Sequence, residues 1–300
     1  MKKVTMQVIS EVLERHETQL LQKANVVGVG IGEKIQRGIP KGILSLKVYV
    51  EKKVAQTQLT KEDVVPQKLS GVESDVEEVG KVVALANSGR YRPALGGVSI
   101  GHYKITAGTF GCLVKDRKNQ TVFILSNNHV FANSNHAQKK DPILQPGNYD
   151  GGKEPEDVIA SLERWIEIGF GTEGNLVDAA LAKPKSKSLV KPEILQIGVP
   201  VGVGRAELGM FVQKSGRTTG YTTGKVKDIS VTVKVQYDKN SALFRNQILT
   251  TAMSQGGDSG SLVLDEKKRA VGLLFAGSSV VTICNPISEV LKLLEVVLFI

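Results

Sequence analysis

The sequence predicts a mainly β protein with a small α/β module at its N-terminus. Its 300 residues are enough for one large or two modest domains. They include 31 glycines and many valines. Valine favours strands and glycine marks the turns between them, so this composition indicates an all-β body with many turns.

Residues 1–88 are expected to form the α/β module. Residues 8–22 carry apolar side chains near one face and charges on the other, which predicts an amphipathic helix docked on the module. A Gly-rich string follows, but no phosphate-binding lysine motif comes after it, so we interpret it as a strand and not as a nucleotide loop. The strands that we expect in this module are residues 26–32, 43–51 and 75–84.

The body of the chain is organised around a serine turn near its C-terminal end. Residues 255–261 read Q-G-G-D-S-G-S and run directly into the apolar strand Leu262-Val263-Leu264. The small neighbours of Ser259 would allow backbone N–H groups to converge beside its hydroxyl. A serine hydroxyl is a weak nucleophile and needs a base and an orienting acid. Both are available upstream, because an apolar strand leads into His129 and a short apolar segment carries Asp178.

The order His129, Asp178, Ser259 resembles the chymotrypsin-like serine peptidases. Their motifs read roughly T-A-A-H-C, D-I-A-L and G-D-S-G-G, and here they read S-N-N-H-V, D-A-A-L and G-D-S-G-S. Residues 214–221, K-S-G-R-T-T-G-Y, are similar to a segment of the bacterial alpha-lytic and streptogrisin branch. The resemblance covers residues 96–300. It implies two six-stranded antiparallel β-barrels, at 96–190 and 191–285, and a C-terminal helix at 286–300.

The resemblance also implies a function, a serine endopeptidase that forms an acyl-enzyme, and a role for each site residue. The implied residues are the catalytic His129, Asp178 and Ser259, the oxyanion-hole N–H groups of Gly257 and Ser259, the substrate-binding Met253, Phe275, Ala276 and Gly277, and the supporting pair of Lys214 and Asp258. Met253 stands where trypsin-like members that cleave after Lys or Arg have an aspartate, so a basic preference is not expected. We also expect Asp258 to turn inward, with Lys214 as its partner in place of an arginine.

Some positions depart from the family pattern. Phe275 replaces a serine that usually helps to hold the aspartate, Ser261 replaces a glycine, and Asn127 and Asn128 replace small residues. Each change could weaken the site, so the alternative is an inactive, peptidase-like binding or scaffold protein. The remaining histidines, His16, His102 and His136, are expected to be surface residues.

Charge and cysteine usage narrow the classes of partner. The net charge of +9 is spread over the chain and aromatic residues make up only 5%, which does not favour nucleic-acid binding. Cys112 and Cys284 lie outside any zinc-ligand spacing and in strands too far apart to bridge, so we expect no metal, no cofactor and a reducing compartment. Charged residues interrupt the N-terminal segment and no apolar run has membrane-spanning length, so a cytoplasmic protein is expected. The expected partners are a protein or peptide substrate and a regulatory partner of the N-terminal module.

Overall fold

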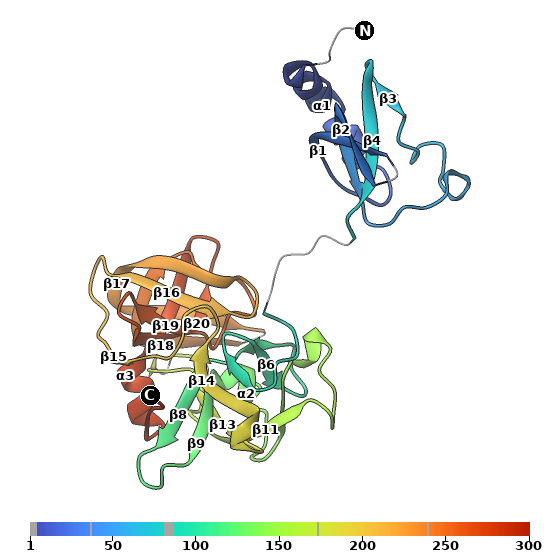
Figure 1. Ribbon diagram of the computed structural model, residues 1–300. Helices are drawn as coiled ribbons and strands as arrows, with labels where there is room; N and C mark the ends of the chain where they lie inside the picture. The colour runs from blue at the N-terminus through green and yellow to red at the C-terminus, as the bar shows by residue number, and fades with distance from the viewer. Residues whose placement is uncertain (1–4, 37, 81–86, 173, 239) are drawn as a thin grey trace. The chain divides into compact units, whose positions relative to one another are not determined.

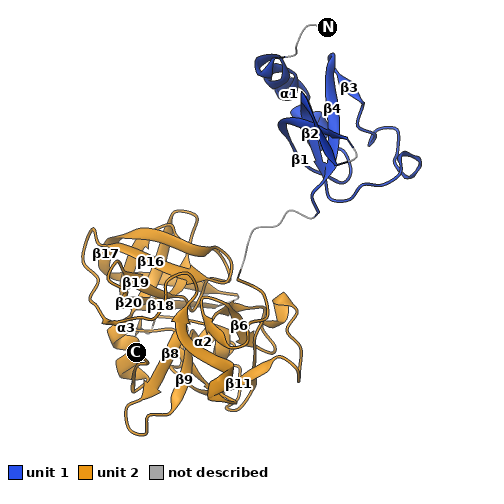
Figure 2. Ribbon diagram, in the orientation of Figure 1, with its two compact units in different colours: residues 1–84 blue, residues 85–300 orange. Residues whose placement is uncertain are grey.

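The chain divides into two compact units, residues 1–84 and 85–300 (Figures 1 and 2). The computed structural model describes residues 5–36, 38–80, 87–172, 174–238 and 240–300. Asn87 belongs to the second unit, because its side-chain amide donates to the backbone oxygens of Gly97 and Gly216. Each unit is described by itself below.

The first unit packs one helix against a four-stranded sheet. Helix α1 (Met6–Leu21) lies on a sheet of strand order β1-β2-β4-β3. The other elements are β1 (Val26–Gln36), β2 (Ile39–Val50), the 3-10 helix η1 (Gln56–Gln58), β3 (Lys68–Leu69) and β4 (Val72–Glu78). Apolar side chains of α1 meet those of β2 and β4 in a small core. The α/β class predicted for this module is confirmed; β4 ends at Glu78, before the expected limit, and residues 81–84 lie outside the described residues.

The second unit contains two eight-stranded sheets, and the first of them has the strand order β22-β8-β9-β13-β11-β10-β6-β7. Its strands are β6 (Ser99–His102), β7 (Gly108–Thr109), β8 (Cys112–Asp116), β9 (Val122–Ser126), β10 (Pro142–Leu144), β11 (Val158–Trp165), β13 (Ala180–Pro184) and β22 (Val296–Leu298). Two short end strands, β7 and β22, raise the number of strands above the six expected. Between β9 and β11, residues 136–152 contain β10 and the 3-10 helix η2 (Asn148–Asp150).

The second sheet closes into a barrel. Its strands are β12 (Gly174–Asn175), β15 (Gly202–Val203), β16 (Phe211–Gly216), β17 (Gly220–Tyr237), β18 (Asn240–Thr251), β19 (Leu262–Asp265), β20 (Arg269–Gly277) and β21 (Val281–Pro286). Strand β21 pairs with both β18 and β20, so β16, β17, β18, β21, β20 and β19 form a ring of antiparallel pairs. This ring is the six-stranded barrel that the sequence predicted, and its closure removes free strand edges.

The C-terminal helix is shorter than expected. Helix α3 comprises Ile287–Leu293 only, and Glu295 then adopts a positive φ of 53° that ends the helical path. The next residues form β22, which pairs with β8 of the first sheet. The prediction of a helix over 286–300 was therefore wrong at its end, because the β-branched pair Val296 and Val297 favours a strand.

The connection between the barrels carries regular secondary structure. It contains the 3-10 helix η3 (Lys187–Leu189) and strand β14 (Val190–Ile194), which pairs in parallel with β5 (Ala94–Gly96). Helix α2 (Asn128–Phe131) completes the elements of this unit. Among the described residues, no helix has the length and apolar character needed to cross a membrane.

Candidate active site

His129 and Asp178 meet because the strands that carry them are neighbours. His129 lies in α2 directly after β9, and Asp178 lies two residues before β13, which pairs with β9. The imidazole Nδ1 is 2.6 Å from the Asp178 Oδ2, and the backbone N–H of His129 donates to Oδ1 at 3.2 Å. The carboxylate therefore fixes both the ring and the start of α2.

Asp178 is fully buried and is held through its backbone as well as its side chain. Its N–H donates to Asn285 Oδ1 at 3.0 Å, and its carbonyl accepts from Asn127 Nδ2 at 2.7 Å. Asn285 comes from β21 of the second barrel, so both barrels contribute to the position of the aspartate. The asparagine at 127, a departure from the family motif, thus helps to position Asp178.

Tyr237 is a site residue that the sequence did not indicate. Its hydroxyl donates to Asp178 Oδ2 at 2.8 Å, and its ring meets the His129 ring edge-on with centroids 6.0 Å apart. Burial, followed by the charge of Asp178, raises the pKa of Tyr237 above its ordinary value, so the hydroxyl remains protonated. One indirect signal was present in the sequence. Phe275 stands where the family usually has a serine that helps to hold the aspartate, and phenylalanine cannot donate a hydrogen bond, so the aspartate needed a different donor.

The turn that carries Ser259 depends on two glycines with positive φ, Gly257 (97°) and Gly260 (96°). A side chain at Gly260 would collide with Ser126 Oγ and with a backbone carbonyl of the first sheet. The Ser261 hydroxyl donates to the carbonyl of Asp258 at 2.6 Å. Serine at 261, another departure from the family motif, therefore stabilises the turn through a hydrogen bond to its own backbone.

The N–H groups of Gly257 and Ser259 are the predicted oxyanion-hole donors. Thr218 Oγ1 donates to the carbonyl of Gly256 at 2.7 Å. Because the peptide is planar and trans, the N–H of Gly257 points the opposite way, away from Thr218. Within the described residues, no acceptor pairs with the N–H of Gly257 or of Ser259. Both predicted oxyanion-hole donors are thus unpaired on one short turn.

Ser259 and His129 border two hollows that share part of their lining. A hollow of about 670 Å³ is bordered by Ser259 and Met253, and an adjoining one of about 810 Å³ by His129. Residues 276–278 at the end of β20 border both hollows. No hydrogen bond joins the Ser259 hydroxyl to His129 among the residues that the structure describes.

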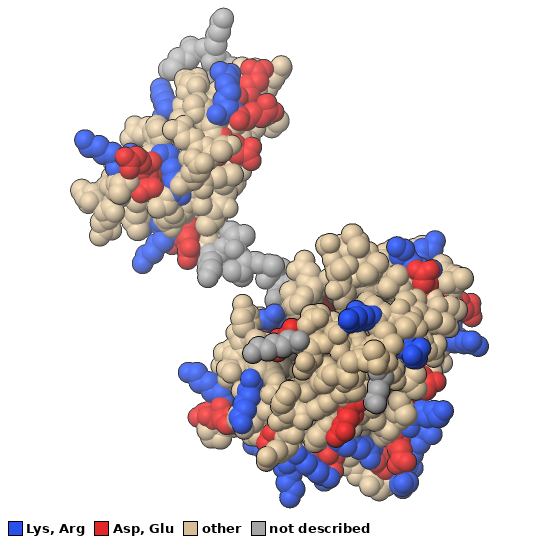
Figure 3. Space-filling model, turned by 180° about the vertical axis from the view of Figure 1, so that it is seen from behind, with Lys and Arg blue, Asp and Glu red and all other residues tan. Residues whose placement is uncertain are grey.

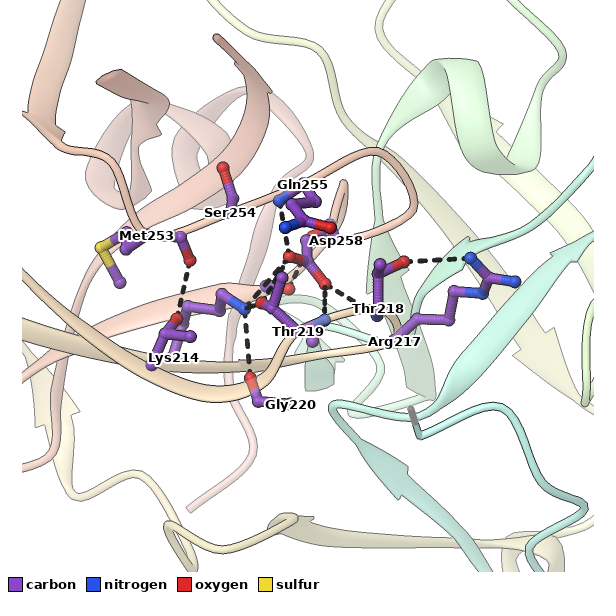
Figure 4. A network of polar contacts seen from close by, with 12 residues as sticks. Lys214, Arg217, Thr218, Thr219, Gly220, Met253, Ser254, Gln255 and Asp258 are labelled. Atoms are coloured by element: carbon purple, nitrogen blue, oxygen red, sulfur yellow. Dashed lines mark hydrogen bonds and ion pairs between the residues drawn. The ribbon is translucent and has the colours of Figure 1, made fainter. Parts of the chain in front are cut away.

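Below the turn, the structure brings Lys214 and Asp258 together (Figure 4). Both side chains are fully buried, and Lys214 Nζ lies 3.2 Å from Asp258 Oδ2. Burial, the largest cause, lowers the pKa of Lys214 despite this pairing. Asp258 also accepts from four other donors, which are the N–H groups of Thr218, Thr219 and Gln255 and the Thr219 hydroxyl. A side chain at Gly216 would collide with this carboxylate.

The other predicted substrate-binding residues surround the cleft. Met253 is nearly buried at the edge of the first hollow, and its N–H donates to Thr282 Oγ1 at 3.1 Å. Within the described residues, the lining of this hollow contains no charged side chain. Ala276 and Gly277 lie on β20, whereas the Phe275 side chain is buried against Phe244, with ring centroids 4.7 Å apart.

His102 and the two cysteines do not line either hollow. His102 was expected at the surface but is buried in β6, where Nε2 lies 2.9 Å from Asp141 Oδ2 and Nδ1 accepts from the N–H of Lys104. Cys112 and Cys284 are unpaired, and burial raises the pKa of each thiol to about 12. No group of three or more potential ligands that could hold a metal ion occurs in the described part of the chain.

Surface charge is mixed. On the face shown in Figure 3, Lys and Arg are interspersed with Asp and Glu over the peptidase-like unit. This distribution differs from the continuous basic face that a nucleic-acid footprint requires.

Comparison with known proteins identifies the family. The trypsin-like peptidase domain matches residues 108–273, more than half of the chain, so this protein belongs to the trypsin-like peptidase family. Thermobifida fusca protease A is 19% identical with a TM-score of 0.50, covering 68% of this chain and 97% of that one. Nocardiopsis protease is 18% identical with a TM-score of 0.52, covering 69% and 98%. A glutamic acid specific serine protease is 23% identical with a TM-score of 0.51, covering 69% and 100%.

These structures confirm the predicted chymotrypsin-like double-barrel fold. A search of curated proteins found no match.

Proposed function

We propose that this protein is a serine endopeptidase that cleaves peptide bonds through an acyl-enzyme. The observation that carries the proposal is the His129–Asp178 pair, 2.6 Å apart, in a hollow that adjoins the hollow of Ser259, where the N–H groups of Gly257 and Ser259 have no acceptor among the described residues. An oriented base, a nucleophile and preorganised donors are the parts that acyl transfer requires.

In the proposed reaction, Ser259 attacks the substrate carbonyl while His129 Nε2 accepts the hydroxyl proton. The N–H groups of Gly257 and Ser259 bind the oxyanion, and one such donor is typically worth about 3 kcal/mol. His129 returns the proton to the leaving amine, and a water molecule then hydrolyses the ester in the reverse sequence. Asp178 keeps the imidazole in the required tautomer and stabilises its cation.

The substrate would lie along the end of β20. Residues 275–277 would pair with its main chain as an added strand, and the side chain before the cleaved bond would enter the hollow beside Met253. Since that lining carries no charge among the described residues, it offers no partner for a buried lysine or arginine.

The alternative is a binding or scaffold protein that keeps the fold without the chemistry. One observation favours it: the Ser259 hydroxyl makes no hydrogen bond to His129 within the described residues. However, such catalytic contacts are often long in structures without substrate and tighten only in the complex.

Hydrolysis of an internally quenched peptide library separates the two functions. We expect wild type to cleave, and Ser259→Ala and Asp178→Asn to lose at least about a thousandfold in kcat. Binding of peptides by the folded wild type, without cleavage at any concentration, would favour the scaffold function.

A further inference from the structure

The long hairpin of β17 and β18 delivers Tyr237 to the aspartate. Tyr237 is the last residue of β17 and pairs with Asn240, the first residue of β18. Its hydroxyl donates to Asp178 Oδ2 at 2.8 Å, and this same oxygen contacts His129 Nδ1 at 2.6 Å. The tip of the hairpin therefore supplies a direct contact to the proposed catalytic pair.

An aromatic cluster fixes the position of this hydroxyl. The Tyr237 ring lies 6.2 Å from the Phe244 ring and 5.9 Å from the Phe170 ring, measured between centroids. Phe244, fully buried, in turn packs on Phe275 at 4.7 Å. A ring held by packing loses little further freedom when its hydroxyl bonds, so the donor is preorganised.

The contact completes the hydrogen bonds of a buried charge. Asp178 Oδ1 accepts from the backbone N–H of His129, and Oδ2 faces both the imidazole and the tyrosine. A buried carboxylate that lacks a donor is costly and can rotate towards water. A donor on Oδ2 also withdraws part of the negative potential that would otherwise stabilise the imidazolium.

We propose that Tyr237 is a positioning residue: its hydroxyl locks the Asp178 rotamer that orients His129. The catalytic part of this inference rests on the proposed peptidase function. It follows that His129 and Asp178 are held in the proposed arrangement only when the β17–β18 hairpin places Tyr237 against Asp178.

Other charged groups near the imidazole do not account for the expected effect. Lys104, Lys234 and Asp238 border the same hollow as His129, and Asp178 contacts the imidazole directly. A Tyr237→Phe change leaves all four in place and removes one hydroxyl. A change in the titration of His129 would therefore report the lost donor.

The test is a Tyr237→Phe variant of the full chain, with Tyr221→Phe as matched control. Tyr221 lies at the other end of β17, and its hydroxyl donates to Gln213 Oε1 at 3.2 Å, so the same atom is removed from the same strand. We expect Tyr237→Phe to lower kcat about tenfold with KM nearly unchanged. The acidic limb of its kcat/KM profile should move up by about 0.5 pH unit, because the imidazolium gains stability. Tyr221→Phe should match wild type.

A second readout separates this inference from the proposed function. The chain has four histidines, so ring-labelled histidine gives an assignable NMR titration in a Ser259→Ala background. An upward shift of the His129 midpoint in Tyr237→Phe supports the positioning role even if the wild type proves inactive. An unshifted midpoint together with wild-type kcat overturns it. Loss of activity in Tyr237→Leu but not in Tyr237→Phe would assign the effect to packing and would also overturn it.

Discussion

Removal of the buried lysine beneath the serine turn is the perturbation whose cost follows most directly from the structure. In a Lys214→Met variant the side chain remains long and apolar, but Asp258 loses its charged partner and the carbonyl of Gly220 loses a donor at 3.1 Å. Both members of the pair are fully buried, so water cannot replace the ammonium without rearrangement.

The expected loss of stability follows from the hydrogen bonds that remain around the Asp258 carboxylate. Removing one member of a buried ion pair typically costs 3–5 kcal/mol, and four other donors still face Asp258, so we expect the lower end, about 3 kcal/mol. For a unit of this size, the loss corresponds to a fall of about 6–12 °C in the melting temperature. Because Asp258 lies between Gly257 and Ser259, displacement of its carboxylate also moves the oxyanion donors, so kcat/KM should fall at least about tenfold.

Thermal unfolding and peptide hydrolysis measure the two effects. Lys227→Met, an exposed lysine on β17, is the matched control and should leave both values unchanged. The double variant Lys214→Met/Asp258→Asn should recover part of the stability, because no buried charge is left unpaired, without recovering activity. A single Lys214→Met variant with wild-type stability and wild-type kcat/KM would refute the reasoning.

Three other predictions concern the cleft and the N-terminal module. Thr218→Val removes the hydroxyl that orients the Gly256 carbonyl, so kcat should fall about tenfold, whereas Thr218→Ser should retain activity. Equal kcat values for the two variants would show that this hydroxyl does not position the turn. In a substrate-profiling panel, cleavage after neutral side chains should dominate, because Met253 supplies no charge; dominant cleavage after Lys or Arg would contradict the assignment of the pocket. Deletion of residues 1–84 leaves Asn87 and its contacts intact and should change the rate or the solubility if the module is regulatory; identical behaviour in both assays would show that it is not.

Features encoded by short motifs were predictable from the sequence. His129, Asp178 and Ser259 each follow or precede a recognisable apolar strand, and the structure brings the first two into contact. The Lys214–Asp258 contact followed from one substitution in a known segment, because a buried carboxylate must find a partner.

Features created by distant parts of the chain could not be predicted in this way. Tyr237 reaches Asp178 across 59 residues of sequence, and only the length of the β17–β18 hairpin determines that contact. A helix was expected over residues 286–300, but Val296–Leu298 form β22, which pairs with β8 at the opposite end of the unit's sequence. His102 appeared polar by its neighbours, but its place in β6 turns it inward to Asp141.

The most direct test of the central claim is the mass of the intact protein after exposure to a fluorophosphonate probe. Such probes react with serines that an adjacent base activates, so we predict one stoichiometric adduct, mapped by peptide fragmentation to Ser259. Labelling should disappear in Ser259→Ala and fall strongly in His129→Ala. If the folded wild type stays unlabelled at saturating probe, or the adduct maps to a different serine, then His129, Asp178 and Ser259 do not form an active triad.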